Sequence, residues 1–180
     1  MNVKLIIISI LLVVSFINPF VERLEFESPV LYMLSHYALI ASGSLLGYTL
    51  LRSAWYNLVL GILPITFWHL PVPFSLGASF IQFRILLEIS IFLGGFLLGS
   101  ALLSVAQWVK VTLFALYMIG DTVLSILFVI ASPLYSNRNG VSPYPPDSLP
   151  LAGISMIVVM NLILAGVIYI SFKTLLEGKL

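Results

Sequence analysis

The chain has 180 residues, of which 61% are hydrophobic and only 8% are charged. A soluble domain has about 25% charged residues, so this composition excludes a water-exposed globular domain and predicts a protein embedded in a lipid bilayer. The net charge of +1 argues against nucleic acid as a partner, and the absence of cysteine excludes disulfides, thiolate metal sites and cysteine nucleophiles.

The N-terminal stretch, MNVKLIIISILLVVSFIN, resembles a signal peptide because one lysine precedes an apolar run. No small-x-small cleavage site follows it, since the next residues, SFINPF, are bulky. We therefore expect a first membrane span that is retained. The charged link VERLEFES separates this span from the next one.

Six segments reach the roughly 20 apolar residues that a transmembrane helix needs. They lie at about 3–20, 29–51, 54–73, 79–103, 106–132 and 150–172. The connections are short except for the proline-rich loop SPLYSNRNGVSPYPPDSLP between the last two spans. The sequence therefore predicts an all-α, polytopic membrane protein, a bundle of six transmembrane helices that forms a single domain over residues 1–180.

The basic residues predict the orientation of this bundle. Six spans place both termini on one side of the membrane, together with Lys4, Arg52, Lys110, Lys173 and Lys179. The other side receives Arg23, Arg84 and Arg138. Because loops rich in lysine and arginine stay in the cytoplasm, we expect cytoplasmic termini in a multi-pass protein of the cell membrane.

Several polar side chains are predicted to lie at a similar depth, in the outer half of the bilayer. His36 lies about 10 Å into the second span, at about 1.5 Å per residue. We expect His69 at the outer end of the third span, where Trp68 favours the interface and the prolines Pro71 and Pro73 end the helix. Tyr135 and Tyr144 of the long loop are likewise predicted as interface anchors.

Metal ligation is the most specific chemistry that these positions indicate. Imidazole nitrogen suits copper, iron and zinc, and thioether sulfur suits copper(I). The candidate ligands are His36, His69, Met33, Met156 and Met160. Two histidines on neighbouring helices could instead ligate a haem axially. A site without any cofactor stays open as well, because transmembrane histidines also serve as interhelical hydrogen bonders and methionines as packing residues.

Three charged residues are predicted to form a buried polar network. Arg84 and Glu88 are four residues apart, a spacing that predicts an ion pair within one helix. Asp121 lies deeper in the fifth span, with Arg84 or Asn161 as its expected partner. Phosphate loops, nucleophile elbows and acid–histidine relays are not recognisable, so we expect no enzymatic activity.

Five stretches occur in an order that is recognisable. They are YMLSHYALIASGSLLGY at 32–48, WHLPVPFSLGAS at 68–79, LLEISIFLGGFLLGS at 86–100, SPLYS at 132–136 and LAGISM at 151–156. Together they resemble the CtaG-type cytochrome c oxidase assembly factors and, more closely, archaeal membrane relatives of unknown function. The assembly factors carry motifs that read roughly His-Met-x-x-His, Trp-His-x-Pro and His-x-x-Glu-His.

The resemblance carries over to six residues of this chain. Met33 and His36 match the first motif, His69 and Pro71 the second, Glu88 the third, and Met156 the methionine of the last helix. The other family histidines are replaced by Tyr32, Ile85 and Ile89. The resemblance implies a non-enzymatic accessory or assembly protein that helps to build the copper centre of a respiratory haem–copper oxidase at the outer face.

Two other functions remain open at this point. The chain could be a structural accessory subunit that docks on a larger membrane complex, with its histidines as hydrogen-bonded struts. It could also be a small-molecule or proton-coupled carrier that uses Asp121, Glu88 and Arg84, although we find no internal repeat of the kind that many carriers show.

Overall fold

The computed structural model describes residues 2–177, which fold into α-helices joined by short connections and one long loop. The helices are α1 (Val3–Phe16), α2 (Pro19–Glu25), α3 (Pro29–Leu50), α4 (Tyr56–Trp68), α5 (Pro71–Ser79), α6 (Ile81–Ala101), α7 (Gln107–Val129) and α8 (Leu149–Leu176). Three short 3-10 turns lie at η1 (Leu102–Ser104), η2 (Asn137–Asn139) and η3 (Pro146–Ser148). The all-α prediction is confirmed.

Four helices in the described part of the chain are long and apolar enough to cross a membrane, namely α3, α6 with η1, α7, and α8 with η3. Two bent pairs also pass the test when each is taken as one span, α1 with α2 at 59° and α4 with α5 at 71°. The protein is therefore a polytopic helical membrane protein with four to six membrane-spanning elements.

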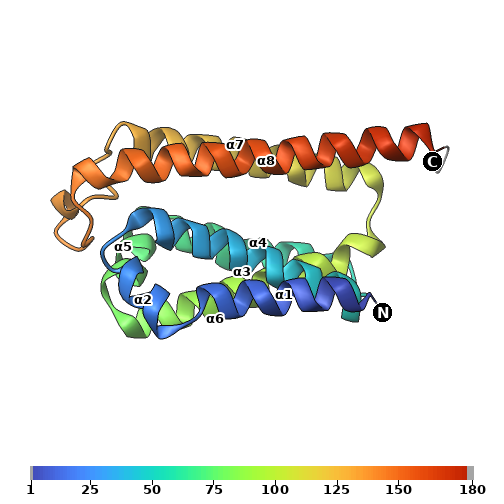
Figure 1. Ribbon diagram of the computed structural model, residues 1–180, viewed down its shortest axis with the longest axis horizontal. Helices are drawn as coiled ribbons and strands as arrows, with labels where there is room; N and C mark the ends of the chain where they lie inside the picture. Colours follow the sequence, from blue (N-terminus) through green and yellow to red (C-terminus); the bar gives the residue numbers. More distant parts are fainter. Residues whose placement is uncertain (1, 178–180) are drawn as a thin grey trace.

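The helices form two groups that lie side by side (Figure 1). Helices α1, α3, α4 and α6 make a bundle in which α3 packs against both α1 and α6, while α7 and α8 pair as a long hairpin. The two termini lie at one end of the molecule, and α2, α5 and the long loop lie at the opposite end (Figure 1).

The cations assign the two ends to the two sides of the membrane. Lys4, Arg52 and Lys173 are exposed at the end that carries the termini, and Lys179 of the prediction lies outside the described residues. At the other end only Arg23 and Arg138 are exposed, because Arg84 is fully buried. By the positive-inside rule we expect the terminal end on the cytoplasmic side, and we call the opposite end the outer end.

Helices α3 and α6 pack closely because glycines line their contact. A Cβ on Gly95 of α6 would lie 2.5 Å from the Ile40 carbonyl oxygen of α3, and one on Gly43 or Gly47 of α3 would overlap the backbone of α6. On the other side of α6, a Cβ on Gly94 would lie 2.7 Å from the Gly61 oxygen of α4. Small residues thus let three helices approach within backbone contact.

The expected third span, 54–73, is broken rather than continuous. Helix α4 ends at Trp68 after 13 residues, a length of about 20 Å at about 1.5 Å per residue, which is shorter than the roughly 30 Å hydrocarbon layer. Leu70 then adopts an extended conformation because Pro71 follows it, and α5 begins in a new direction. His69 lies at the C-terminus of α4, at the bend into α5, and not inside a continuous span.

Candidate functional site

Two histidines from neighbouring helices meet inside the bundle. His36 lies seven residues after the start of α3 and is 1% exposed, and His69, which is half-buried, caps the C-terminus of α4. Their ring centroids are 5.3 Å apart, with an angle of 70° between the ring planes. The early end of α4 puts the two imidazoles at a shared depth.

The hydrogen bonds of the two rings fix their tautomers. Nδ1 of His36 lies 2.5 Å from the Tyr32 carbonyl oxygen, and Nδ1 of His69 lies 2.6 Å from the Ile65 carbonyl oxygen. A carbonyl oxygen can only accept, so each Nδ1 carries the proton and each neutral ring keeps a lone pair on Nε2. Nε2 of His36 is buried and has no hydrogen-bond partner. This backbone anchoring of one ring nitrogen is also how ligating histidines are commonly oriented.

The long loop holds the end of α4 in place. The Tyr135 hydroxyl donates to the His69 carbonyl oxygen over 2.9 Å, which satisfies a group that the helix end would leave unpaired. The Tyr135 ring packs against Phe74 and Phe128 at centroid distances of 5.3 Å and 5.1 Å. Burial raises the pKa of the Tyr135 hydroxyl, so it remains a donor. Tyr135 is thus a buried support, not the interface anchor that was predicted.

The predicted methionine ligands divide between two places. Met33 and Met156 are 1% and 0% exposed and belong to the buried cluster that also contains Tyr32 and Trp68. Met160 instead lies where α7 meets α8, where the Thr122 hydroxyl donates to its sulfur over 3.4 Å. The structure therefore leaves Met33 and Met156 as thioethers in the core that holds His36.

The geometry of the histidine pair can be compared with that of metal sites. Two imidazoles on one tetrahedral metal have ring centres about 5 Å apart, given metal–nitrogen bonds of about 2 Å. The observed separation of 5.3 Å fits this arrangement. It does not fit axial ligation of haem, because a porphyrin plane between the rings would push their centres to about 6 Å. Among the described residues, no group of three or more histidines and carboxylates could hold an ion.

Arg84 is fully buried and pairs with Glu25 of α2 across 3.1 Å, not with Glu88 of its own helix as predicted. Its remaining donors reach the carbonyl oxygens of Gly77, Ala78 and Glu22. The guanidinium carbon also lies 3.9 Å from the centre of the Phe26 ring and 4.8 Å from that of Tyr32. Arg84 therefore joins α2, α5 and α6 at the outer end.

Tyr144 adds the long loop to this junction, although its sequence suggested only an interface anchor. Its side chain is 0% exposed, and its hydroxyl donates to the Glu25 carbonyl oxygen over 2.5 Å. Burial raises the pKa of this hydroxyl, which keeps the proton that it donates. The alternation of tyrosine, serine and proline in the loop carries no signal that predicts this inward position.

Glu88 lies close enough to Arg84 for an electrostatic interaction but forms no ion pair with it, and Asp121 lies elsewhere, against α3. Glu88 faces a groove between α1 and α6 that Glu22 also lines. Asp121 accepts a hydrogen bond from the Tyr37 hydroxyl of α3, so neither expected partner is correct. Asn161, the other candidate, donates to the Ile157 carbonyl oxygen of its own helix. Of the three predicted network residues, Arg84 and Glu88 thus lie near each other without pairing, while Asp121 occupies a separate environment.

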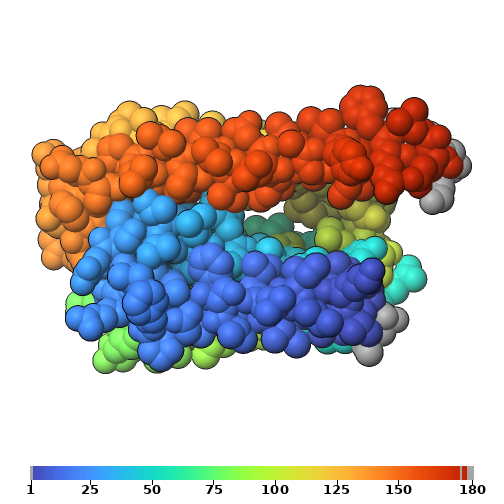
Figure 2. Space-filling view, viewed as in Figure 1, coloured from blue at the N-terminus to red at the C-terminus, as the bar shows by residue number. Residues whose placement is uncertain are grey.

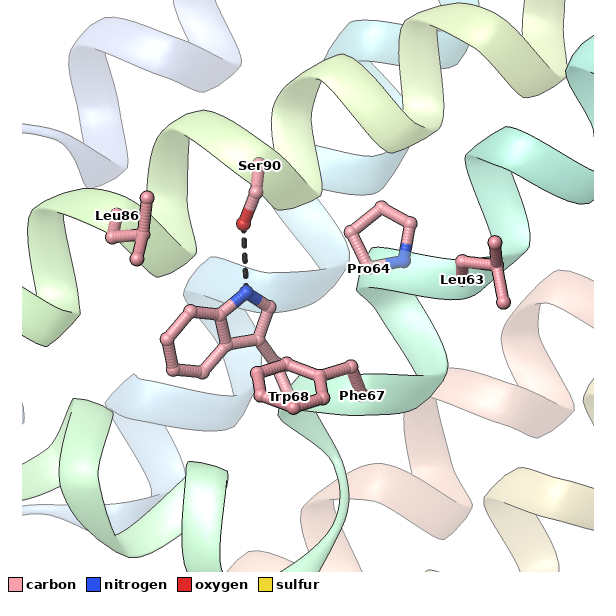
Figure 3. Close-up of a pocket in the computed structure, with 6 residues that line it drawn as sticks. All are labelled: Leu63, Pro64, Phe67, Trp68, Leu86 and Ser90. Atoms are coloured by element: carbon pink, nitrogen blue, oxygen red, sulfur yellow. Dashed lines mark hydrogen bonds between the residues drawn. The ribbon is translucent and has the colours of Figure 1, made fainter.

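A second groove lies on the lipid-facing side of α4 and α6 (Figure 3). Its lining is apolar apart from Ser90, whose hydroxyl accepts a hydrogen bond of 2.7 Å from the Trp68 indole nitrogen. This bond holds the Trp68 ring, which is 4% exposed, between the two helices rather than at the interface. The groove offers no titratable or metal-ligating group.

The fold and these buried groups define a class: a polytopic helical membrane protein with a polar interior in its outer half. A family model described as "Protein of unknown function (DUF1404)" matches residues 7–174, so the chain belongs to this family. Neither the curated proteins nor the solved structures contain a significant match.

Proposed function

We propose that this protein is a non-enzymatic accessory or assembly protein of a respiratory haem–copper oxidase in the cell membrane, and that it binds one copper ion between His36 and His69. The observation that carries the proposal is the pair of imidazoles that keep their Nε2 lone pairs at 5.3 Å between ring centres.

The donor set favours copper(I) over other first-row metals. Zinc and iron sites of proteins use three or four protein ligands, often with carboxylates or thiolates, and no such group exists among residues 2–177. Copper(I) accepts imidazole together with thioether sulfur, and Met33 and Met156 lie in the same buried core. When bound, the ion would rest on neutral ligands in an apolar surrounding.

The position of the pair supports a role at the outer face. His69 stands at the end of α4, which faces the outer end of the molecule, and the loop that holds it through Tyr135 comes from that side. The resemblance to oxidase assembly factors implies the same face. An ion held there is close to the compartment in which the copper centre of an oxidase would be supplied.

Copper binding is tested with the purified full-length protein in nanodiscs. We expect wild type to take up one copper(I) per chain in competition with a chromophoric chelator, and the His36→Ala and His69→Ala double variant to take up none. Met160→Leu is the matched control, because its sulfur lies away from the histidines. Far-ultraviolet circular dichroism checks that the double variant folds. Wild type without copper, or a double variant that keeps it, would contradict the proposal.

The oxidase role is tested separately, by deleting the gene in the native organism. The proposal expects the purified oxidase to have less copper and lower activity, with recovery when copper is added to the medium or when wild type is restored. Restoring the double histidine variant should give no recovery. An oxidase with full copper content in the deletion strain would refute this role while leaving copper binding itself intact.

A docked accessory subunit is the second candidate, and the α7–α8 hairpin favours it. Large side chains in the inner half of α8, such as Leu162, Ile170 and Phe172, are more than 60% exposed. Figure 2 shows a hollow between this part of α8 and α1. This function expects the protein to stay with a larger complex at fixed stoichiometry through mild-detergent purification, and migration alone on a native gel would count against it.

A further inference from the structure

Asp121 stands within α7 without a cationic partner in the described part of the chain. The ion pairs among residues 2–177 are Arg84 with Glu25 and Lys173 with Glu177. Asp121 receives one hydrogen bond, from the Tyr37 hydroxyl to Oδ1, while its Oδ2 is buried and has no partner. A carboxylate in this position carries an uncompensated charge inside the bilayer, which is energetically costly.

Two further oxygens on the same helix are buried and unpartnered. They are the Tyr117 hydroxyl and the Ser125 hydroxyl, which flank Asp121 at a spacing of four residues and so share its face of α7. The Ser125 side chain is 0% exposed. Buried polar atoms nearly always have a partner, so three orphan oxygens in a row indicate a ligand that supplies hydrogen bonds.

The surroundings limit what this ligand can be. The titratable side chains on the elements around Asp121 are Tyr32, His36, Tyr37 and Tyr48 of α3, Lys110 and Tyr117 of α7, and Tyr169 and Lys173 of α8. Of these only Tyr37 hydrogen-bonds to Asp121, and neither lysine forms an ion pair with it. His36 precedes Tyr37 directly but contacts His69 of α4. With no ion pair to a cation here, the charge of Asp121 is removed most simply by a proton, and water molecules can join each neighbouring pair of orphan oxygens.

We propose that Tyr37, Tyr117, Asp121 and Ser125 form a second intramembrane site, which holds one exchangeable proton on Asp121 and water molecules that connect its carboxyl group to Tyr117 on one side and to Ser125 on the other. The site lies on the side of α3 that faces the hairpin, next to the histidine pair along the chain but separate from it. It does not depend on copper binding, and it stands if the proposed function fails.

The proton is tested by labelling the full-length protein in nanodiscs with a hydrophobic carbodiimide, which reacts with protonated carboxyl groups in apolar surroundings. We expect mass spectrometry to find Asp121 labelled several-fold more than the exposed Glu27 at neutral pH, with labelling lost at high pH. Replacement of choline by Na⁺ in the buffer, at constant ionic strength, should leave the labelling of Asp121 unchanged. An unlabelled Asp121, or protection by Na⁺, would overturn the assignment of a proton.

The water is tested by infrared spectroscopy of the same samples. Wild type should show a carboxylic acid C=O band at neutral pH that is absent in Asp121→Asn. In the Tyr117→Phe and Ser125→Ala double variant, the band should move to higher frequency because the bridge to the carboxyl group is lost. If the band does not move in the double variant, the water is refuted. If wild type shows no band, the proton on Asp121 is refuted. Circular dichroism checks that each variant is folded.

Discussion

Replacement of Glu25 by glutamine tests whether the buried ion pair with Arg84 holds the outer end together. Glutamine keeps the shape of the side chain and an oxygen that can accept from the guanidinium, so the variant removes the negative charge alone. Both partners are at most 1% exposed, and their atoms are 3.1 Å apart. In Glu25→Gln, the Arg84 cation would remain buried and uncompensated.

The size of the effect follows from this burial. Loss of one partner of a buried pair costs about 3–5 kcal/mol. Arg84 keeps its three carbonyl acceptors and its two aromatic neighbours, so we expect a value at the low end, about 3 kcal/mol. For a chain of this length the loss corresponds to a fall in Tm of roughly 6–12 °C.

Thermal unfolding in detergent micelles, followed by circular dichroism, measures this difference. The matched control is Glu27→Gln, two residues further on, because Glu27 is exposed and should change the free energy of unfolding by less than about 0.5 kcal/mol. If Glu25→Gln were as stable as Glu27→Gln, the buried pair would not be an anchor of the outer end, and the reasoning from burial would be refuted.

Two further substitutions test the packing and the support of the site. Gly95→Ala should lower the free energy of unfolding, because its Cβ would lie 2.5 Å from the Ile40 carbonyl oxygen. Gly120→Ala should raise the free energy of unfolding by about 0.5–1 kcal/mol, because a Cβ at this position meets nothing within 4 Å. Equal effects of the two variants in chemical denaturation would contradict the close contact at Gly95. Tyr135→Phe removes the donor to the His69 carbonyl oxygen and should lower the free energy of unfolding by about 1–3 kcal/mol and weaken copper(I) retention. A variant that matches wild type in both measurements would show that the loop does not support the histidine site.

The apolar segments, the location of both termini at one end and the glycine contacts were predictable because each depends on local composition. Span length follows from runs of apolar residues, and orientation follows from counts of lysine and arginine. Gly43, Gly47 and Gly95 lie where helices meet, as small residues in membrane helices usually do. None of these inferences requires knowledge of which helices are neighbours.

Partner choice was not predictable, because it depends on how helices rotate and bend in three dimensions. The spacing of Arg84 and Glu88 allows an ion pair, but Arg84 pairs with Glu25 instead, because the 59° bend between α1 and α2 brings Glu25 next to it. Tyr37 follows His36 in the sequence, and nothing in the pattern indicates that it points at Asp121. The prolines at Pro71 and Pro73 indicated that the helix ends there, but the length of α4 before this break depends on where the helix begins.

The distribution of polar groups along the bundle follows from which elements pack together in its inner half and in its outer half. In the inner half, α3 and α6 meet backbone to backbone at Gly47 and Gly99, and this contact leaves no room for large polar side chains. In the outer half, α4 ends early and its place is taken by α5 and the long loop, which bring backbone carbonyls and the Tyr135 and Tyr144 hydroxyls into the interior. Arg84 is tolerated there because α5 and α2 supply carbonyl oxygens that accept from its guanidinium. The histidine rings are held differently, because each Nδ1 donates to a carbonyl oxygen of its own helix, Tyr32 for His36 and Ile65 for His69. The early end of α4 brings the two rings together, and Tyr135 of the long loop satisfies the His69 carbonyl oxygen that this helix end would leave unpaired.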